Sequence, residues 1–152
     1  MIVNEPIAIT GEWLFYLDGR LVKREKNLIV QAGLNFLAQL LIRENGQTND
    51  IPFHLALGTG TTAPAATDIK LVTEGLRKAV SAKTRQANMA RLRTFFLPSE
   101  ANATWYEFGI FLAGTATKDS GTMLNRIVPT GGISKSAQQV LTIECRLTLA
   151  AG

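Results

Sequence analysis

The chain has 152 residues, a formal net charge of +4, one histidine and one cysteine. This length fits one domain whose core buries roughly two-thirds of the unfolded surface. The single cysteine, Cys145, excludes an internal disulfide and argues against a cysteine metal cluster. No run approaches the ~18 apolar residues of a membrane helix. The opening "MIVNEPIAIT" also lacks the basic start of a secretory signal.

The balance of apolar and charged residues predicts a covered surface. Hydrophobic residues make up 46% of the chain and charged residues only 18%. A domain of this size has a small core, so part of this apolar surface is expected to pack against a partner. We therefore expect a homo-oligomer, and a trimer is the specific prediction.

The strongest local signal is a β-hairpin near the N-terminus. The segment "EWLFYL" (12–17) precedes Asp18-Gly19, and "RLVKREK" (20–26) follows. Asp-Gly accepts the positive φ angles of a two-residue hairpin turn. The apolar start of the chain, "MIVNEPIAI", is predicted to be an extended arm that adds a strand to a neighbour's sheet edge.

One segment has helical periodicity. In "NLIVQAGLNFLAQLLIREN" (27–45), leucines at positions 34, 37 and 41 recur at steps of three and four, and Asn45-Gly46 supplies a stop. An amphipathic helix of about three turns, packed on a sheet, is predicted here. Gly33 either costs this helix about 1 kcal/mol relative to alanine or marks its entry turn.

The glycine-rich stretch "LALGTGTTAPAATD" (55–68) is either a phosphate-binding loop or a surface loop. A phosphate-binding P-loop needs a lysine directly after its last glycine and a helix behind it. Here the next lysine after Gly60 is Lys70, and Pro64 lies where the helix would run. We predict a strand (53–58), then an ordered surface loop that binds no nucleotide. Thr67-Asp68 is expected to cap a short helical turn over 69–75.

Basic residues gather in the segment 76–98, which contains no acidic residue. The cluster is either a contact for nucleic acid or an acidic partner, or the basic solvent faces of two strands. No nucleic-acid-binding motif accompanies it, which favours the second interpretation. The residues concerned are Arg77, Lys78, Lys83, Arg85, Arg91 and Arg93.

The rest of the chain predicts short strands. In 140–149, apolar and polar residues alternate, which is typical of a strand with one buried face, and Cys145 belongs to the apolar set as a core residue. The segment 105–112 carries aromatic residues on both faces, so both faces are expected to be covered. Further strands are predicted at 76–84, 91–97 and 121–128.

These elements predict a mainly β fold, an antiparallel β-sandwich of jelly-roll type with one amphipathic helix packed on it. The expected organisation is an N-terminal arm and hairpin, residues 1–26, and a β-sandwich domain with the helix, residues 27–152. Together they are expected to form a single compact domain.

The sequence gives little support for catalysis. His54 lies in an apolar strand without a neighbouring acid or thiol, and the carboxylates are scattered without metal-ligand spacing. Glu74 and Arg77 are expected to form a structural ion pair, and Glu107 to face a basic residue on a neighbouring strand. We assign no catalytic, cofactor-binding or metal-binding residue, and we expect that the protein is not an enzyme.

Five segments, in order, resemble a family of small phage and prophage virion proteins, often described as tail or tail-fibre proteins. They are "NLIVQAGLNFLAQLL", "FHLALGTGTTAPAATDIKLVTEGLRKAV", "PSEANATWYEFGIF", "SGTMLNRIV" and "ISKSAQQVLTIECRLTL", and they span about residues 27–149. Cys145 stands where the family has an aromatic residue and Phe108 where it has valine or leucine, and both substitutions keep the strand pattern. The resemblance implies a virion component without catalytic residues.

The leading hypothesis is a non-enzymatic bacteriophage structural protein, in the tail, fibre or baseplate or on the capsid exterior as a decoration protein. Its expected partners are copies of itself and other virion proteins. We expect no small-molecule substrate, cofactor, membrane or nucleic-acid partner. Its expected location is the virion, after assembly in the bacterial cytoplasm. The alternative is a carbohydrate- or host-surface-binding module that uses Trp13, Tyr16 or Trp105 as a stacking platform.

Overall fold

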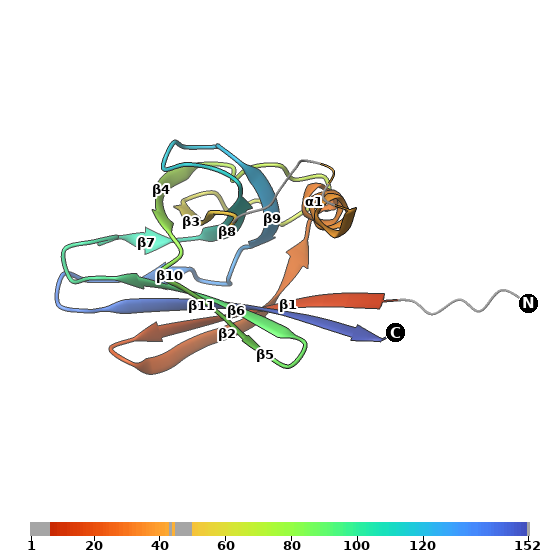
Figure 1. Cartoon of the computed structure of the whole chain (residues 1–152). Coiled ribbons are helices and arrows are strands. Elements are labelled where there is room, and N and C mark those ends of the chain that lie inside the picture. The colour runs from red at the N-terminus through yellow and green to blue at the C-terminus, as the bar shows by residue number, and fades with distance from the viewer. Residues whose placement is uncertain (1–6, 43, 45–49, 152) are drawn as a thin grey trace, which may run out of the picture.

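The computed structural model describes residues 7–42, 44 and 50–151, which form an antiparallel, mainly β fold with one helix. Nine strands form a single curled sheet in the order β4-β3-β8-β9-β2-β1-β11-β6-β5, and β10 and β7 form a separate ribbon (Figure 1). The predicted fold class is confirmed. The elements are β1 (Ile7–Leu17), β2 (Arg20–Ile29), α1 (Gln31–Ile42), β3 (Phe53–Gly58), β4 (Glu74–Ala79), β5 (Ala82–Gln86), β6 (Met89–Phe96), β7 (Thr104–Trp105), β8 (Glu107–Leu112), β9 (Thr122–Ile127), β10 (Ile133–Ser134) and β11 (Leu141–Ala151).

Strand β2 joins the two layers of the sheet. Most of β2 pairs with β1, whereas its last two residues, Leu28 and Ile29, pair with β9. The sheet turns at this point, so β1, β2, β11, β6 and β5 form one layer and β3, β4, β8 and β9 form the other (Figure 1). The sequence-based boundary between residues 26 and 27 falls inside β2.

The predicted N-terminal hairpin is confirmed. Asp18 and Gly19 have φ angles of 50° and 77°, the left-handed values that a tight hairpin turn requires. The resulting β1 lies between β2 and β11, near the middle of the sheet order. Of the proposed N-terminal arm, residues 1–6 lie outside the described part of the chain, and Ile7–Ile9 pair with β11 of the same molecule.

The predicted helix is confirmed: α1 has 12 residues, which at 3.6 residues per turn is about three turns. It does not fill the whole quoted segment 27–45, because the first residues of that segment belong to the sheet. Residues 27–29 continue β2, and α1 begins only at Gln31. Gly33 lies inside the helix, where a Cβ atom would come within 2.5 Å of the Leu124 carbonyl oxygen on β9. The absence of a side chain at Gly33 therefore permits α1 to pack closely on β9. The predicted stop, Asn45-Gly46, lies outside the described residues.

The buried face of α1 also differs from the prediction. Phe36 is buried and Leu37 packs against the core, but the side chain of Leu41 is 87% exposed. A strict step of three and four residues places Leu41 on the same face as Leu37, yet in the third turn it is the neighbouring Leu40 that packs against the core.

The predicted strand at 76–84 is in fact two strands. β4 ends at Ala79, and β5 begins at Ala82 at the opposite end of the sheet order. Val80 and Ser81 make the crossing: the Val80 N–H donates to the Phe53 carbonyl of β3, and the Ser81 N–H donates to the Arg93 carbonyl of β6. The apolar alternation continues across this break, so the sequence does not reveal it.

The core between the layers is centred on aromatic residues. Phe15 and Phe108 meet edge to face with ring centroids 4.8 Å apart, and Trp13 packs against both rings. Every residue of β8 is buried, which confirms the expectation that both faces of this strand are covered. Cys145 is buried in the same core, and burial raises the pKa of its thiol to about 12, so it is not a reactive thiolate at neutral pH.

Candidate functional site

The glycine-rich loop is held by a buried carboxylate on β8. Glu107 accepts hydrogen bonds from the backbone N–H groups of Gly60 and Thr73, at 3.0 and 2.7 Å, and of Val72, at 2.9 Å. Its other partner is Arg126 of β9, whose Nη2 lies 2.8 Å from Glu107 Oε2. This confirms the expected basic neighbour of Glu107.

Arg126 holds the middle of the same loop. Its guanidinium donates to the Thr62 carbonyl at 2.9 Å and to the Asp68 carboxylate at 3.0 Å. Asp68 in turn accepts the N–H of Ala65. The helical turn expected after Asp68 is wrong, because this segment runs irregularly into β4. The loop is thus an ordered surface segment in which Glu107 and Arg126 bind five residues, Gly60, Thr62, Asp68, Val72 and Thr73.

The same contacts oppose a phosphate ligand. A phosphate loop offers free backbone N–H groups. The Gly60 N–H is already bound to Glu107, and the carboxylate places negative charge where a phosphate would lie. Alanine would not fit at Gly58 or Gly60, since a Cβ atom would come within 2.6 Å of Glu107 Oε1 at either position. These glycines therefore permit close approach to the carboxylate.

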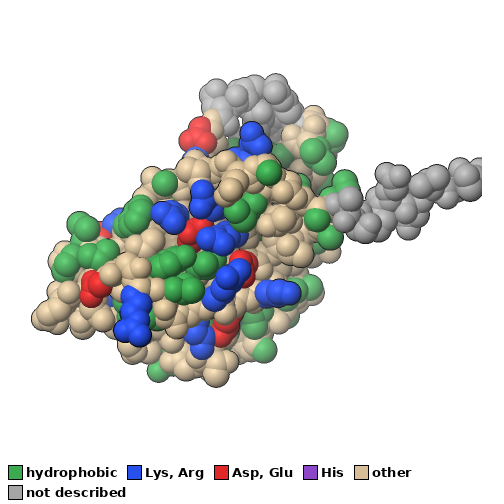
Figure 2. All heavy atoms as spheres, turned by 90° about the horizontal axis from the view of Figure 1, so that it is seen from below, with side chains coloured by type: hydrophobic (Ala, Val, Ile, Leu, Met, Phe, Trp, Pro, Cys, Tyr) green, Lys and Arg blue, Asp and Glu red, His purple; other side chains and the backbone are tan. Residues whose placement is uncertain are grey.

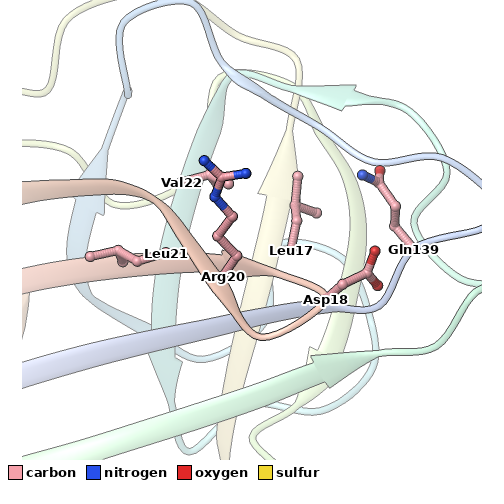
Figure 3. A pocket seen from close by; sticks show the side chains of 6 residues that line it. All are labelled: Leu17, Asp18, Arg20, Leu21, Val22 and Gln139. Atoms are coloured by element: carbon pink, nitrogen blue, oxygen red, sulfur yellow. The ribbon is translucent and has the colours of Figure 1, made fainter.

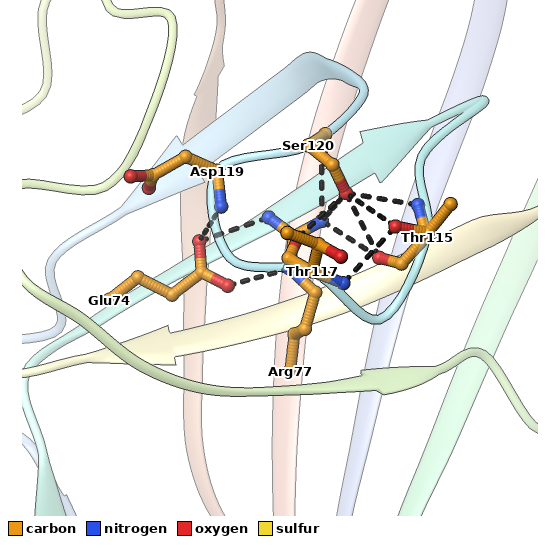
Figure 4. Close-up of polar contacts among 6 residues, drawn as sticks. All are labelled: Glu74, Arg77, Thr115, Thr117, Asp119 and Ser120. Atoms are coloured by element: carbon orange, nitrogen blue, oxygen red, sulfur yellow. Dashed lines mark hydrogen bonds and ion pairs between the residues drawn. The ribbon is translucent and has the colours of Figure 1, made fainter.

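Glu74 and Arg77 of β4 form a second buried ion pair (Figure 4). Arg77 Nε and Nη2 donate to the two Glu74 oxygens at 2.6 and 2.9 Å, and both side chains are 2% exposed. Burial by itself raises the pKa of Glu74, but the bonds from Arg77 and from the Asp119 N–H outweigh burial and hold the pKa below its usual range.

Arg77 also fixes the β8–β9 connection. Its Nη1 donates to the Ser120 carbonyl and hydroxyl at 2.9 and 3.0 Å and to the Thr115 carbonyl at 3.2 Å (Figure 4). The guanidinium carbon lies 4.5 Å from the Phe111 ring centroid. The partners of the pair are groups of the fold itself, which confirms the expected structural ion pair.

The lone histidine is isolated from other catalytic groups. His54 is 8% exposed, and its Nδ1 has no hydrogen-bond partner among the described residues. Burial, assisted by the nearby charge of Arg77, lowers its pKa and keeps it neutral near pH 7. Within the described part of the chain, no three His, Cys, Asp or Glu side chains are grouped as a metal site requires.

One end of the molecule exposes large aliphatic side chains. We call this surface the apolar end. It lies where β1 begins, β11 ends and α1 packs on the sheet (Figure 1). A groove of about 420 Å³ runs along it between β1, the end of β2 and Leu34 of α1. The exposed members, with their exposed fractions, are Ile7 (75%), Leu28 (38%), Leu34 (38%), Leu41 (87%), Ile42 (74%) and Leu149 (49%).

The outer face of the β1–β11–β6 layer is rich in arginine, and we call it the arginine face. Figure 2 views it directly and shows hydrophobic side chains in its middle with Lys and Arg side chains around them. At its centre, Glu144 is fully buried and lies between arginines of β6 and β11. Members of the face are Glu12, Leu14, Tyr16, Leu21, Arg24, Lys26, Arg91, Arg93, Phe95, Thr142, Glu144 and Arg146.

The basic segment 76–98 does not form one continuous patch. Arg77 is buried, and Lys78 pairs with Glu100 in the layer of β4. Lys83 pairs with Asp50, whereas Arg91 and Arg93 belong to the arginine face of the other layer. The expectation of basic strand faces is confirmed in so far as these cations lie on strands. They do not form the faces of one pair of strands, however, since they are divided among β4, β5 and β6 and most of them have acidic partners.

The stacking platform of the carbohydrate-binding alternative is not present as predicted. Trp13 is fully buried, and Trp105 is 8% exposed with its Nε1 donating to the Ala101 carbonyl. Of the three proposed aromatic residues, Tyr16 alone is partly accessible.

An open hollow of about 610 Å³ lies beside the hairpin turn (Figure 3). Its lining combines apolar and polar side chains, but Asp18 is used to fix the turn, since its carboxylate accepts the Val140 N–H at 2.9 Å. The lining residues are Leu17, Asp18, Arg20, Leu21, Val22 and Gln139.

Comparison with known proteins gives no relative: no protein-family model, curated protein sequence or solved structure matches this chain. Within the described residues, no helix has the length and apolar character needed to span a membrane.

Proposed function

We propose that the protein is a non-enzymatic structural component of a bacteriophage particle that assembles with copies of itself and with other virion proteins. The observation that carries this proposal is the apolar end. Ile7, Leu28 and Leu34 line an apolar groove there and are 75%, 38% and 38% exposed, and Leu41 and Ile42 at the end of α1 are 87% and 74% exposed. Exposed apolar side chains of this kind are typical of a protein contact.

The buried polar groups support a structural role. The Glu107–Arg126 and Glu74–Arg77 pairs hold loops, and their hydrogen bonds go to the fold itself. The order of the five quoted segments, which resembles small phage virion proteins, supports the assignment to a particle. Tail, fibre, baseplate and capsid exterior are all compatible positions.

Self-assembly is tested by sedimentation of the purified protein at micromolar concentration. We expect a trimer of about 50 kDa, three times the chain mass of 16.5 kDa. The double variant Leu41→Asp/Ile42→Asp is expected to sediment as a folded monomer, because two carboxylates would have to enter an apolar contact. Ile69→Asp is the control, since Ile69 is 67% exposed in the loop between β3 and β4 and is not a member of the apolar end.

The location is tested by labelling purified particles with an antibody against the protein and viewing them by electron microscopy. Label at one defined position of intact particles is expected. A monomeric wild-type protein that is also absent from the particles would refute the proposed function.

A further inference from the structure

The arginine face carries more positive charge than its own carboxylates neutralise. Rows of side chains cross the layer in register: Glu12, Arg146 and Arg91 lie opposite one another, and so do Leu14, Glu144 and Arg93 in the next row. Arg24 and Lys26 extend these rows on β2. Five cations thus share the face with two carboxylates, Glu12 and Glu144.

The Glu144 carboxylate lies within 4 Å of three arginine side chains. Arg93 Nη2 lies 3.0 Å and Arg146 Nε 2.9 Å from its oxygens, whereas Arg91 Nη1 is 3.9 Å away. Burial raises the pKa of Glu144, but the hydrogen bonds from Arg146 and Arg93 outweigh it and lower the pKa, so the carboxylate stays ionised. Its hydrogen bonds come from Arg93 and Arg146, whereas Arg91 is too far away to donate one.

In the described part of the chain, Arg91 has only a long ion pair, with Nη1 3.9 Å from Glu144 Oε1. It lies directly across from Arg146, and like charges in this cross-strand position repel. Its Nε is buried and has no hydrogen-bond partner among the described residues. The fold therefore holds a pair of guanidinium groups together at a cost that an added oxyanion would remove.

An amphipathic hollow lies on the other side of the Glu144 row. It has a volume of about 230 Å³ and is lined by Tyr16, Gly19, Arg93, Phe95 and Thr142. Phe95 is 38% exposed there. A surface that combines arginine, tyrosine and phenylalanine has the composition of the centre of a protein–protein interface.

We propose that the arginine face docks an acidic protein surface, with a partner carboxylate bound by Arg91 and Arg146 and an apolar partner side chain in the Tyr16–Phe95 hollow. The proposal rests on the proposed function in one respect, because the partner is then a different component of the particle. A second copy does not fit, since its own arginine face has the same excess of positive charge.

The alternation of charge favours protein over nucleic acid. A phosphate backbone requires a track of cations without intervening negative charge. Here Glu12, which pairs with Arg24, interrupts the row of Arg146 and Arg91 with a negative charge. The hollow beside Tyr16 and Phe95 adds an apolar contact to one side of the cations. Separate carboxylates on a folded or extended partner match this pattern better.

The test uses a short synthetic peptide of glutamate and phenylalanine as probe, with oligodeoxythymidylate of matched charge for comparison. We expect the peptide to bind the wild type more tightly than the oligonucleotide does. Arg91→Gln/Arg146→Gln is expected to weaken peptide binding at least about tenfold, equivalent to about 1.4 kcal/mol. Lys70→Gln/Lys118→Gln removes the same charge from exposed loops and is expected to change it by less than about twofold.

Phe95→Thr tests the hollow without altering charge and guards against misfolding of the double arginine variant. It is expected to weaken peptide binding at unchanged melting temperature. Equal peptide binding by all variants, or tighter oligonucleotide binding that the arginine variant abolishes, would overturn the proposal. So would dissociation of the oligomer by Arg91→Gln/Arg146→Gln, since the face would then be a self-contact. A monomeric wild type that still binds the peptide would instead refute the proposed self-assembly alone.

Discussion

Glu107 and Arg126 lie on adjacent strands, β8 and β9, and form an ion pair of 2.8 Å whose side chains are 0% and 1% exposed. Each also holds part of the loop that links β3 to β4. The pair thus connects the layer of β3, β4, β8 and β9 to its longest described surface loop. In the sheet, Arg126 lies directly across from Leu28 of β2, a member of the apolar end.

Glu107→Gln is expected to destabilise the fold by about 3–5 kcal/mol, because the buried Arg126 charge would lose its principal partner. Urea unfolding measures the change. Glu100→Gln is the matched control: Glu100 pairs with Lys78 at a partly exposed site, so its loss is expected to cost less than about 1 kcal/mol. Similar losses for the two variants would contradict the structural role of the buried pair.

Gly33→Ala is expected to destabilise the protein by about 1–3 kcal/mol, although alanine is the better helix former. The new Cβ atom would lie 2.5 Å from the Leu124 carbonyl oxygen and push α1 away from β9. Asn35→Ala, at an exposed position of the same helix, is the control and is expected to be neutral or slightly stabilising. A stabilised Gly33→Ala protein in thermal unfolding would show that the helix is not packed in this way.

Leu37→Asp is expected to prevent folding into a soluble protein, since it brings an unpaired carboxylate against the core. Leu41→Asp, one turn later on the exposed end of α1, is expected to leave the monomer folded. Circular dichroism and the soluble yield distinguish the two outcomes. A Leu37→Asp protein that unfolds cooperatively at wild-type temperature would contradict the packing of this helix.

The free energy of unfolding is expected to decrease in two stages as the pH is lowered. The pKa of His54 is lowered by burial and by Arg77, so the unfolded chain binds the proton more tightly and stability is lost as the pH falls below 6.5. The pKa values of Glu74 and Glu144 are lowered because bonds from their arginine partners outweigh burial, so their contribution is lost below 4.5.

Urea midpoints measured from about pH 8 to about pH 3 test this dependence. In His54→Gln, the loss of stability below pH 6.5 is expected to be smaller, whereas the loss below pH 4.5 is expected to remain. An unchanged slope near pH 6 in that variant would show that another group is responsible.

No saturable binding is expected when ATP, GTP or NAD is titrated against the protein in a calorimeter. The Gly60 N–H donates to Glu107, whose negative charge repels phosphate, and Lys70 is the first lysine after the glycines. A nucleotide that bound at micromolar affinity, and that lost binding on substitution of Gly60, would reopen the enzyme hypothesis.

Local chemistry made several elements predictable from the sequence. Asp18-Gly19 specified the hairpin turn, and the period-two pattern of 140–149 specified β11, because both depend on neighbouring residues alone. The Glu74–Arg77 pair was also accessible, since its members are close in sequence. Arg126 was not identified, because its partners lie 19 to 64 residues away.

The errors arose where long-range pairing overrode the local pattern. Leu28 and Ile29 lie in the segment quoted for the helix but join β9. Val80-Ser81 lies inside a predicted strand but crosses between the layers. The arginine face was hidden for the same reason. Its cations come from three strands that only the sheet brings together, and segment 76–98 mixes them with residues of the other layer.

The pairing of β1 with β11 links folding to translation. The two strands are matched along their full length, from Ile7 opposite Ala151 to Leu17 opposite Leu141. Ribosomes add about 5–20 residues per second, so β11 leaves the exit tunnel on the order of ten seconds after β1. Throughout that interval the nascent chain carries Trp13 and Phe15 on a strand without its principal partner. The sheet is therefore completed only after nearly all of the described chain has been synthesised, and a transcript truncated before β11 yields a product that cannot close its core.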